Sequence, residues 1–189
     1  MAHDGQDLGM TGVVILDDLL TLTAAAVAPV EAVLETAKNR LRGLVSENGR
    51  VSARLVEDHQ TATHGLAWLA TYSQSLREMN KWAEALNADG KFGEVEKLIL
   101  QITFGEYLWQ VYGGIQMNQG EILRPQDMGL TQDDMRAMME PAVQSLTQHG
   151  NTQAARIRLV ELMQERSAEA TVGASGLDDE LEMIRDQFR

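Results

Sequence analysis

Apolar residues recur along this chain at steps of three and four, the spacing of amphipathic helices, and almost nowhere alternate as they would in strands. Alanine, leucine, glutamate, glutamine and methionine, which favour helices, are abundant, and the 189 residues include only three prolines. The pattern therefore predicts an all-α fold, a helical bundle of about five to six helices. We expect no β-strand.

The first two predicted helices are long. One runs over about 14–45, and Pro29 is expected to break or kink it because proline removes a backbone donor. A turn signal at residues 48–49, Asn-Gly, separates it from a second helix over about 52–87. Gly90 is expected to adopt the left-handed conformation that ends this second helix.

The third predicted helix, about 91–115, is apolar on most of its faces and is therefore expected to be the buried centre of the bundle. It contains Gly93 and Gly105, each of which weakens a helix by about 1 kcal/mol relative to alanine. Close approach of a neighbouring helix would compensate that loss. Residues 113–130, with a proline and several glycines, are predicted to be the longest irregular stretch.

Shorter helices are predicted beyond this stretch. Thr131 and Asp134 have the spacing of a capping box, and the helix that they start is expected to be split near Pro141. A turn at residues 149–151 leads into a further helix over about 152–166.

The chain ends on LDDELEMIRDQFR, which has the apolar stripe of an amphipathic helix formed by Leu177, Leu181, Ile184 and Phe188. No glycine, asparagine or proline follows to cap the helix. The stripe is therefore expected to pack onto a body that the preceding residues do not supply.

These patterns divide the chain into four parts. Residues 1–12 are predicted to be a flexible tail and residues 13–166 a helical domain. Residues 167–176, small and polar, have the composition of a linker, and residues 177–189 form the separate terminal helix.

Composition narrows the classes of partner. The formal net charge is −12 and no basic cluster occurs, which disfavours nucleic acid and anionic membrane surfaces as direct partners. The absence of cysteine excludes disulfides, thiolate zinc sites and a cysteine nucleophile.

The N-terminus has acidic residues where a secretory signal has basic ones, so a cytoplasmic location is expected. The apolar runs look shorter than the roughly 20 residues of a membrane span, so no transmembrane helix is expected.

Candidate catalytic chemistry is not evident. His59 and His64 are five residues apart, which places their rings on different faces of a helix, and a single helix chelates zinc with a spacing of four. Acidic pairs lie at predicted helix starts, where the helix dipole favours them. The tryptophans and tyrosines fall at helical spacing, typical of core or groove residues. We therefore assign no catalytic, cofactor-binding or metal-binding residue.

A polar docking surface is the remaining candidate site. It lies in the irregular stretch that follows the third helix and does not have the sequence of a phosphate-binding loop. Its proposed residues are Gln116, Asn118, Gln119 and Arg124.

Four segments resemble a known family. HGLAWLATYSQSLREMNKWAEAL (64–86) and KFGEVEKLILQITFGEYLWQVYGGIQMNQGEILRPQDMGL (91–130) resemble the N-terminal extension of the (2S)-methylsuccinyl-CoA dehydrogenases, flavin-dependent members of the acyl-CoA dehydrogenase family. HGNTQAARIRLVELM (149–163) and ATVGASGLDDELEMIRDQFR (170–189) resemble the passage from that extension into the dehydrogenase core. The resemblance covers about residues 50–189.

The resemblance implies an accessory domain that is structural or shapes the substrate pocket. Residues 177–189 would be the first helix of a dehydrogenase core that lies outside this chain, in cis or on a neighbouring chain. The intact enzyme would use FAD to oxidise the Cα–Cβ bond of a branched dicarboxylic acyl-CoA, with a glutamate base and hydride transfer to flavin N5. It would pass electrons to an electron-transfer flavoprotein and form a homo-oligomer. None of the catalytic or FAD-binding positions matches a residue of this chain.

Two other functions stay open. A free-standing acidic adaptor would bind another helix through the terminal apolar stripe or through Met138 and Met139. A metal- or haem-binding bundle would use His59 or His64.

Overall fold

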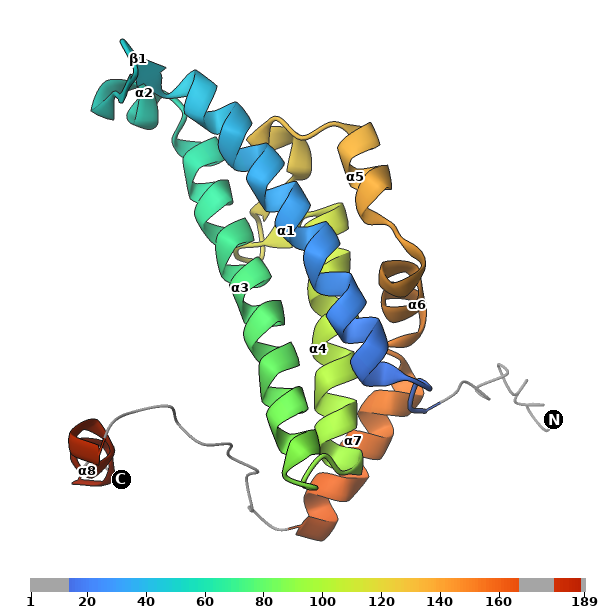
Figure 1. Cartoon of the computed structure of the whole chain (residues 1–189). Helices are drawn as coiled ribbons and strands as arrows, with labels where there is room; N and C mark the ends of the chain where they lie inside the picture. The colour runs from blue at the N-terminus through green and yellow to red at the C-terminus, as the bar shows by residue number, and fades with distance from the viewer. Residues whose placement is uncertain (1–13, 167–178, 188–189) are drawn as a thin grey trace, which may run out of the picture.

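The computed structural model describes residues 14–166 and 179–187, and it confirms the all-α helical bundle (Figure 1). The expected tail at 1–12 and linker at 167–176 lie outside these residues. The elements are α1 (Leu19–Leu44), β1 (Ser46–Glu47), β2 (Arg50–Val51), α2 (Ala53–Asp58), α3 (Gln60–Ala88), α4 (Glu94–Gly113), β3 (Ile115–Gln116), β4 (Ile122–Leu123), the 3₁₀ helix η1 (Pro125–Met128), α5 (Gln132–Met138), α6 (Pro141–His149), α7 (Gln153–Arg166) and α8 (Asp179–Gln187).

Three long helices form the body of the bundle. α3 runs antiparallel to α1 and α4, and all three pack against one another (Figure 1). α6 packs on α1 and α4, whereas α7 packs on α4 at one end of the bundle. The expectation of no strand is wrong at two places, where β1–β2 and β3–β4 form antiparallel ladders of two residues per strand.

The first helix differs from its prediction in two respects. It begins at Leu19, later than expected, and it does not end at Pro29. A proline inside a helix removes one backbone hydrogen bond, and the turns on both sides of Pro29 are held by buried residues, among them Ala26 and Val33. The packing of these turns therefore keeps α1 continuous.

α1 is also more apolar than the short apolar runs in its sequence suggested. An 18-residue window within it has a mean hydropathy of 1.5, so by length and composition alone this helix could cross a membrane. The expectation that no segment reaches this length is therefore wrong on those criteria. A third of the window is buried, and the buried residues of α1 belong to the main core of the bundle.

The predicted second helix is divided in two at His59, whose backbone has φ −112° and ψ 34°. α2 has no buried residue, so no core packing holds it in line with α3. α3 buries a full stripe that includes Leu69 and Leu76. The expected turns are present on both sides, since Asn48, Gly49 and Gly90 have positive φ.

The core has two parts. The larger part joins the inner faces of α1, α3, α4, α5 and α6, and the ring of Phe104 on α4 is fully buried within it. Met138 also belongs there, so it offers no contact surface. The smaller part lies between α4 and α7, where Leu98 packs with Ala155 and Leu162. As predicted, α4 is the central helix of the bundle.

Gly105 on α4 makes the predicted close approach to a neighbour. A Cβ at this position would lie 2.6 Å from the backbone nitrogen of Asn151 and 2.9 Å from the carbonyl oxygen of Leu146. A Cβ at Gly150, in the turn between α6 and α7, would lie 2.6 Å from the Gln101 carbonyl oxygen and 3.2 Å from the Gly105 Cα. The two glycines therefore let backbone meet backbone. Gly93 lies outside the helix, as the N-cap of α4.

Replacing Gly105 with alanine tests this contact. Alanine favours an isolated helix by about 1 kcal/mol over glycine, yet here its methyl group would force backbone atoms apart, which costs about 1–3 kcal/mol or more. We expect Gly105→Ala to lower the free energy of unfolding, measured by urea denaturation with circular dichroism. Gly43→Ala, in a helical position with nothing within 4 Å, is the control and should be neutral or slightly stabilising. Equal behaviour of the two variants would contradict the contact.

Candidate docking surfaces

The predicted docking residues lie on and beside the β3–β4 hairpin, which is anchored by its apolar side chains. Ile115 and Leu123 face each other across the ladder and are buried. Leu123 and Met128 occupy the space that a side chain at Gly65 of α3 would need. The hairpin therefore sits against α3 because that position carries only a hydrogen atom.

All four predicted docking residues are exposed, and two of them have structural partners. The Asn118 side chain accepts a hydrogen bond from the Gly120 amide and donates one to Glu121, which shapes the hairpin tip. Arg124 donates to the carbonyl oxygen of Gly113, so it ties the two ends of the hairpin together. Gln116 and Gln119 present their amides on the surface. The docking role of these residues stays a prediction.

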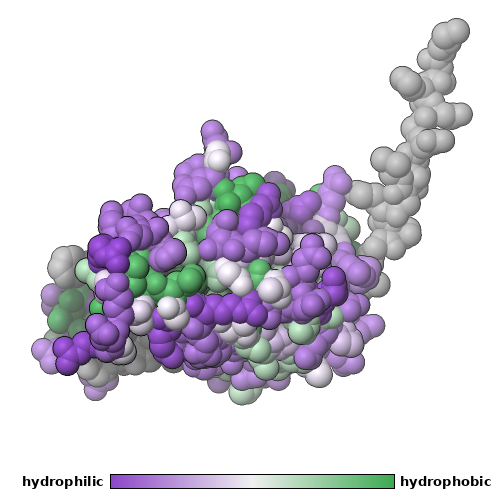
Figure 2. Space-filling view, turned by 90° about the horizontal axis from the view of Figure 1, so that it is seen from above, coloured by the Kyte–Doolittle hydropathy of each residue, from purple (hydrophilic) through white to green (hydrophobic). Residues whose placement is uncertain are grey.

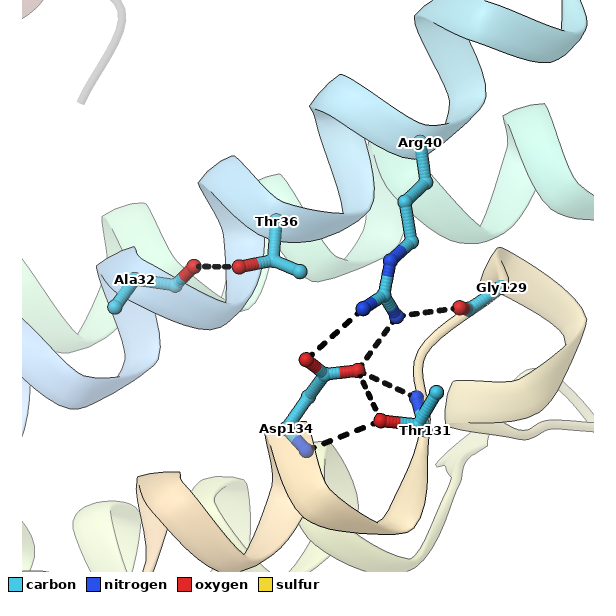
Figure 3. A network of polar contacts seen from close by, with 6 residues as sticks. All are labelled: Ala32, Thr36, Arg40, Gly129, Thr131 and Asp134. Atoms are coloured by element: carbon cyan, nitrogen blue, oxygen red, sulfur yellow. Dashed lines mark hydrogen bonds and ion pairs between the residues drawn. The ribbon is translucent and has the colours of Figure 1, made fainter.

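A charged network holds the segment after the hairpin against α1 (Figure 3). Arg40 on α1 donates to both carboxylate oxygens of Asp134, at 2.5 and 3.0 Å, and to the Gly129 carbonyl oxygen at 2.6 Å. The same carboxylate accepts bonds from the amide and hydroxyl of Thr131, and the Asp134 amide donates to the Thr131 hydroxyl. The predicted capping box is thus confirmed, and it is joined to a neighbouring helix.

His64, Trp68 and Tyr72 of α3 form a row of ring contacts that reaches Tyr107 of α4. Trp68 donates from Nε1 to Nε2 of His64 and meets Tyr72 edge to face. Tyr72 stacks on Tyr107 with ring centroids 4.4 Å apart and donates from its hydroxyl to Gln110. Burial, followed by the neighbouring Tyr107 and Glu106, raises the pKa of Tyr72. The row thus fits the predicted groove residues.

Trp109 is an exception to the prediction that the tryptophans are core or groove residues. The residue is 47% exposed, its Nε1 donates to the Thr147 carbonyl oxygen at 2.6 Å, and Tyr112 packs edge-on against its ring. The ring is therefore fixed on the surface.

A metal site does not form within residues 14–166 and 179–187, where no group of three or more histidine or acidic side chains could hold an ion. The hollow beside His59 includes Glu57, Asp58 and Asp127, but His64 points elsewhere, toward Trp68.

Much of the apolar surface lies on the last two described helices. Figure 2 views the end of the bundle opposite α7, where hydrophilic side chains dominate and hydrophobic ones form small patches. Six large apolar residues of α7 and α8 are exposed, and they are Ile157, Val160, Met163, Leu181, Met183 and Ile184.

The α8 members include two of the four residues predicted to pack onto a missing core. Leu181 is 47% and Ile184 is 42% exposed. Leu177 and Phe188 lie outside the described residues. The packing partner of the stripe stays a prediction.

The sequence reasoning did not find the outer face of α7. We use this name for Ile157, Val160 and Met163, which point away from α4 while Ala155 and Leu162 point toward it. Apolar residues on both sides of one helix were the available signal, because a surface helix normally has one apolar stripe.

The Arg40–Asp134 network predicts a specific response to acid. Hydrogen bonds from Arg40, then from Thr131, hold the pKa of Asp134 at about 2, whereas the carboxyl group of an unfolded chain titrates near 4. This contribution to stability is complete above about pH 4 and is lost as the pH falls toward 2. Asp134→Asn should lower the free energy of unfolding by about 1–2 kcal/mol at pH 7.

Urea denaturation at pH 7, 4 and 2.5 checks this prediction. The difference between wild type and Asp134→Asn should shrink across the acid range. Asp133→Asn, which removes an 86% exposed carboxylate one residue earlier, is the control and should change little. A constant difference at all three pH values would contradict the role of Asp134.

The exposure of α8 predicts rapid hydrogen exchange. An isolated helix of nine residues is marginal in water, and its apolar side chains are exposed here. The amides of Leu181 and Ile184 should show protection factors below about 10, whereas those of the buried Leu100 and Leu108 should be strongly protected. Strong protection at Leu181 and Ile184 in a monomer would contradict this prediction.

Comparison with known proteins supplies the context for these surfaces. No family profile matches the chain. A (2S)-methylsuccinyl-CoA dehydrogenase of Cereibacter sphaeroides is 54% identical to it over 182 residues, which are 95% of this chain and 32% of that enzyme. The chain therefore spans about a third of the length of the curated relative, and the resemblance seen in its sequence is confirmed as a match to part of an acyl-CoA dehydrogenase.

Proposed function

We propose that this chain is the N-terminal accessory helical domain of an FAD-dependent acyl-CoA dehydrogenase that acts on a branched dicarboxylic acyl-CoA such as (2S)-methylsuccinyl-CoA. The observation that carries the proposal is the 54% identity over 95% of the chain. On this proposal α8 is the first helix of the dehydrogenase core, in cis or on a neighbouring chain.

The chemistry of the described residues supports a structural or pocket-shaping role. Every buried side-chain nitrogen and oxygen atom among them has a hydrogen-bond partner within the bundle. The buried amide of Gln101, for example, is bonded to the backbone of Val14, Leu16 and Gly150. These polar groups serve the fold and do not converge on a cradle for a flavin or a CoA. We therefore assign FAD to the rest of the enzyme, where it would accept the hydride.

The remaining features of the proposal follow from the relative's class of enzyme. The complete protein would be a cytoplasmic homo-oligomer and would deliver its electrons to an electron-transfer flavoprotein. The described residues would hold the first core helix and the entrance of the acyl pocket in place, and would take no part in proton or hydride transfer.

A free-standing adaptor is the alternative function. The exposed apolar residues of α8 favour it as much as they favour docking onto a dehydrogenase core. The acidic charge of the chain fits either function. Recovery of a flavoprotein dehydrogenase alone from the native host would argue against a general adaptor.

A chimera tests the proposed function. The matched third of the Cereibacter sphaeroides enzyme is replaced by this chain, and the purified chimera is assayed for bound FAD and for oxidation of (2S)-methylsuccinyl-CoA with an artificial electron acceptor. We expect FAD content near that of the parent enzyme and activity within about tenfold of it, because the two segments share 54% of their residues. The enzyme without this third is the control and should lose activity or solubility.

Two outcomes would contradict the proposal. One is a chimera that lacks FAD and activity although the isolated chain is folded and the parent enzyme is active. The other comes from the DNA that follows codon 189, which we expect to encode, or to adjoin, a dehydrogenase core. A stop codon without such a gene nearby would argue for the adaptor.

A further inference from the structure

We propose that the outer face of α7, formed by Ile157, Val160 and Met163, is the surface on which the dehydrogenase core docks. This inference rests on the proposed function and adds the location of the contact. It concerns a face of the helical domain itself, distinct from the stripe of α8 that the sequence already indicated.

The first observation is that α7 has an exposed apolar side. Ile157, Val160 and Met163 are 46%, 54% and 59% exposed, and they follow one another at steps of three along one side of the helix. The opposite side of α7 is already covered, because Ala155 and Leu162 pack with Leu98 of α4 in a buried cluster. A helix that is apolar on two sides is typical of a position between two packed bodies.

Polar contacts fix α7 on α4, so the outer face has a defined direction. Arg158 bonds both carboxylate oxygens of Glu94, at 2.8 and 3.0 Å, and Arg156 bonds Asn151 at the start of the helix. The backbone contact between Gly105 and Gly150 fixes the turn before α7. The outer face is therefore presented by a rigid element, as a docking surface requires.

The size of the face indicates which partner it fits. Three half-exposed side chains cover far less than the roughly 800 Å² that each partner buries in a standard interface. A second copy of the chain, or a free protein, would bind such a face too weakly. A partner joined by a short tether experiences an effective concentration in the millimolar range, which makes a small contact sufficient.

The position of α7 in the chain supplies that tether. Only residues 167–178 separate α7 from α8, and twelve residues reach at most about 40 Å. In the Cereibacter sphaeroides enzyme 68% of the chain lies outside the match, so most of that protein is available to form the partner body. The occupant that fits both the small area and the short reach is the dehydrogenase core that would include α8.

Site-resolved thiol labelling tests the contact. The chain has no cysteine, so Val160→Cys introduces its first thiol. The rate at which iodoacetamide modifies this thiol is measured by mass spectrometry in the isolated chain and in the chimera. We expect at least a tenfold slower reaction in the chimera. Val51→Cys, on a 67% exposed valine at the other end of the bundle, is the control and should react equally in both proteins.

A charge at the same position provides a second readout. In the isolated chain, Val160→Asp and Val51→Asp should each change Tm by less than about 2 °C, because both side chains are exposed. In the chimera, Val160→Asp should lower Tm by about 5 °C or more and accelerate the loss of FAD, while Val51→Asp should not.

Three results would overturn the docking proposal, each obtained with a chimera that binds FAD and is active. They are equal labelling of Val160→Cys in both proteins, equal effects of the two aspartate variants in the chimera, and concentration-dependent protection in the isolated chain, which would identify a second copy as the occupant. A chimera without FAD or activity would instead count against the proposed function.

Discussion

The contact between Gly105 and Gly150 is the constraint on which the arrangement of the bundle depends. It brings the α6–α7 turn onto the backbone of α4, closer than any side chain would allow. Two consequences follow for packing. α6 can contribute Val143 and Leu146 to the main core, and α7 can cover Leu98 in the N-terminal part of α4. One pair of glycines therefore places helices on two adjoining parts of the central helix.

The polar groups of the bundle serve mainly to fix its elements. Asp134 caps α5 and binds Arg40 of α1, so that the start of α5 is held against α1. Arg158 binds α7 to Glu94 at the start of α4. The described residues have the properties of a scaffold whose chemistry is directed inward. On our proposal the exposed apolar residues of α7 and α8 are the features directed toward a partner, in keeping with an accessory role beside a larger enzyme.

Periodicity predicted most of the fold because most helices of this chain have one apolar side. It predicted the central position of α4, the close approach at Gly105 and the capping box at Thr131 correctly. It did not foresee that α2 and α3 divide at His59, and of the break or kink expected at Pro29 the break is absent, because tertiary packing decides whether a helix continues. Local sequence does not contain that information. The outer face of α7 was overlooked for a related reason, since apolar residues on both sides of a helix look the same in sequence whether the second side is covered or exposed.

Two of the three bonds of Gln101 hold the segment from Val14 to Leu16 beside α4, and Ile15 packs into the same small cluster as Ala155 and Leu162 of α7. The described chain thus enters the bundle next to the helix by which it leaves. A unit with neighbouring entry and exit points can be joined to another protein through adjacent attachment points, without its path having to wrap around the host. Neighbouring termini are the arrangement in which gene fusion and internal insertion of a domain are best tolerated.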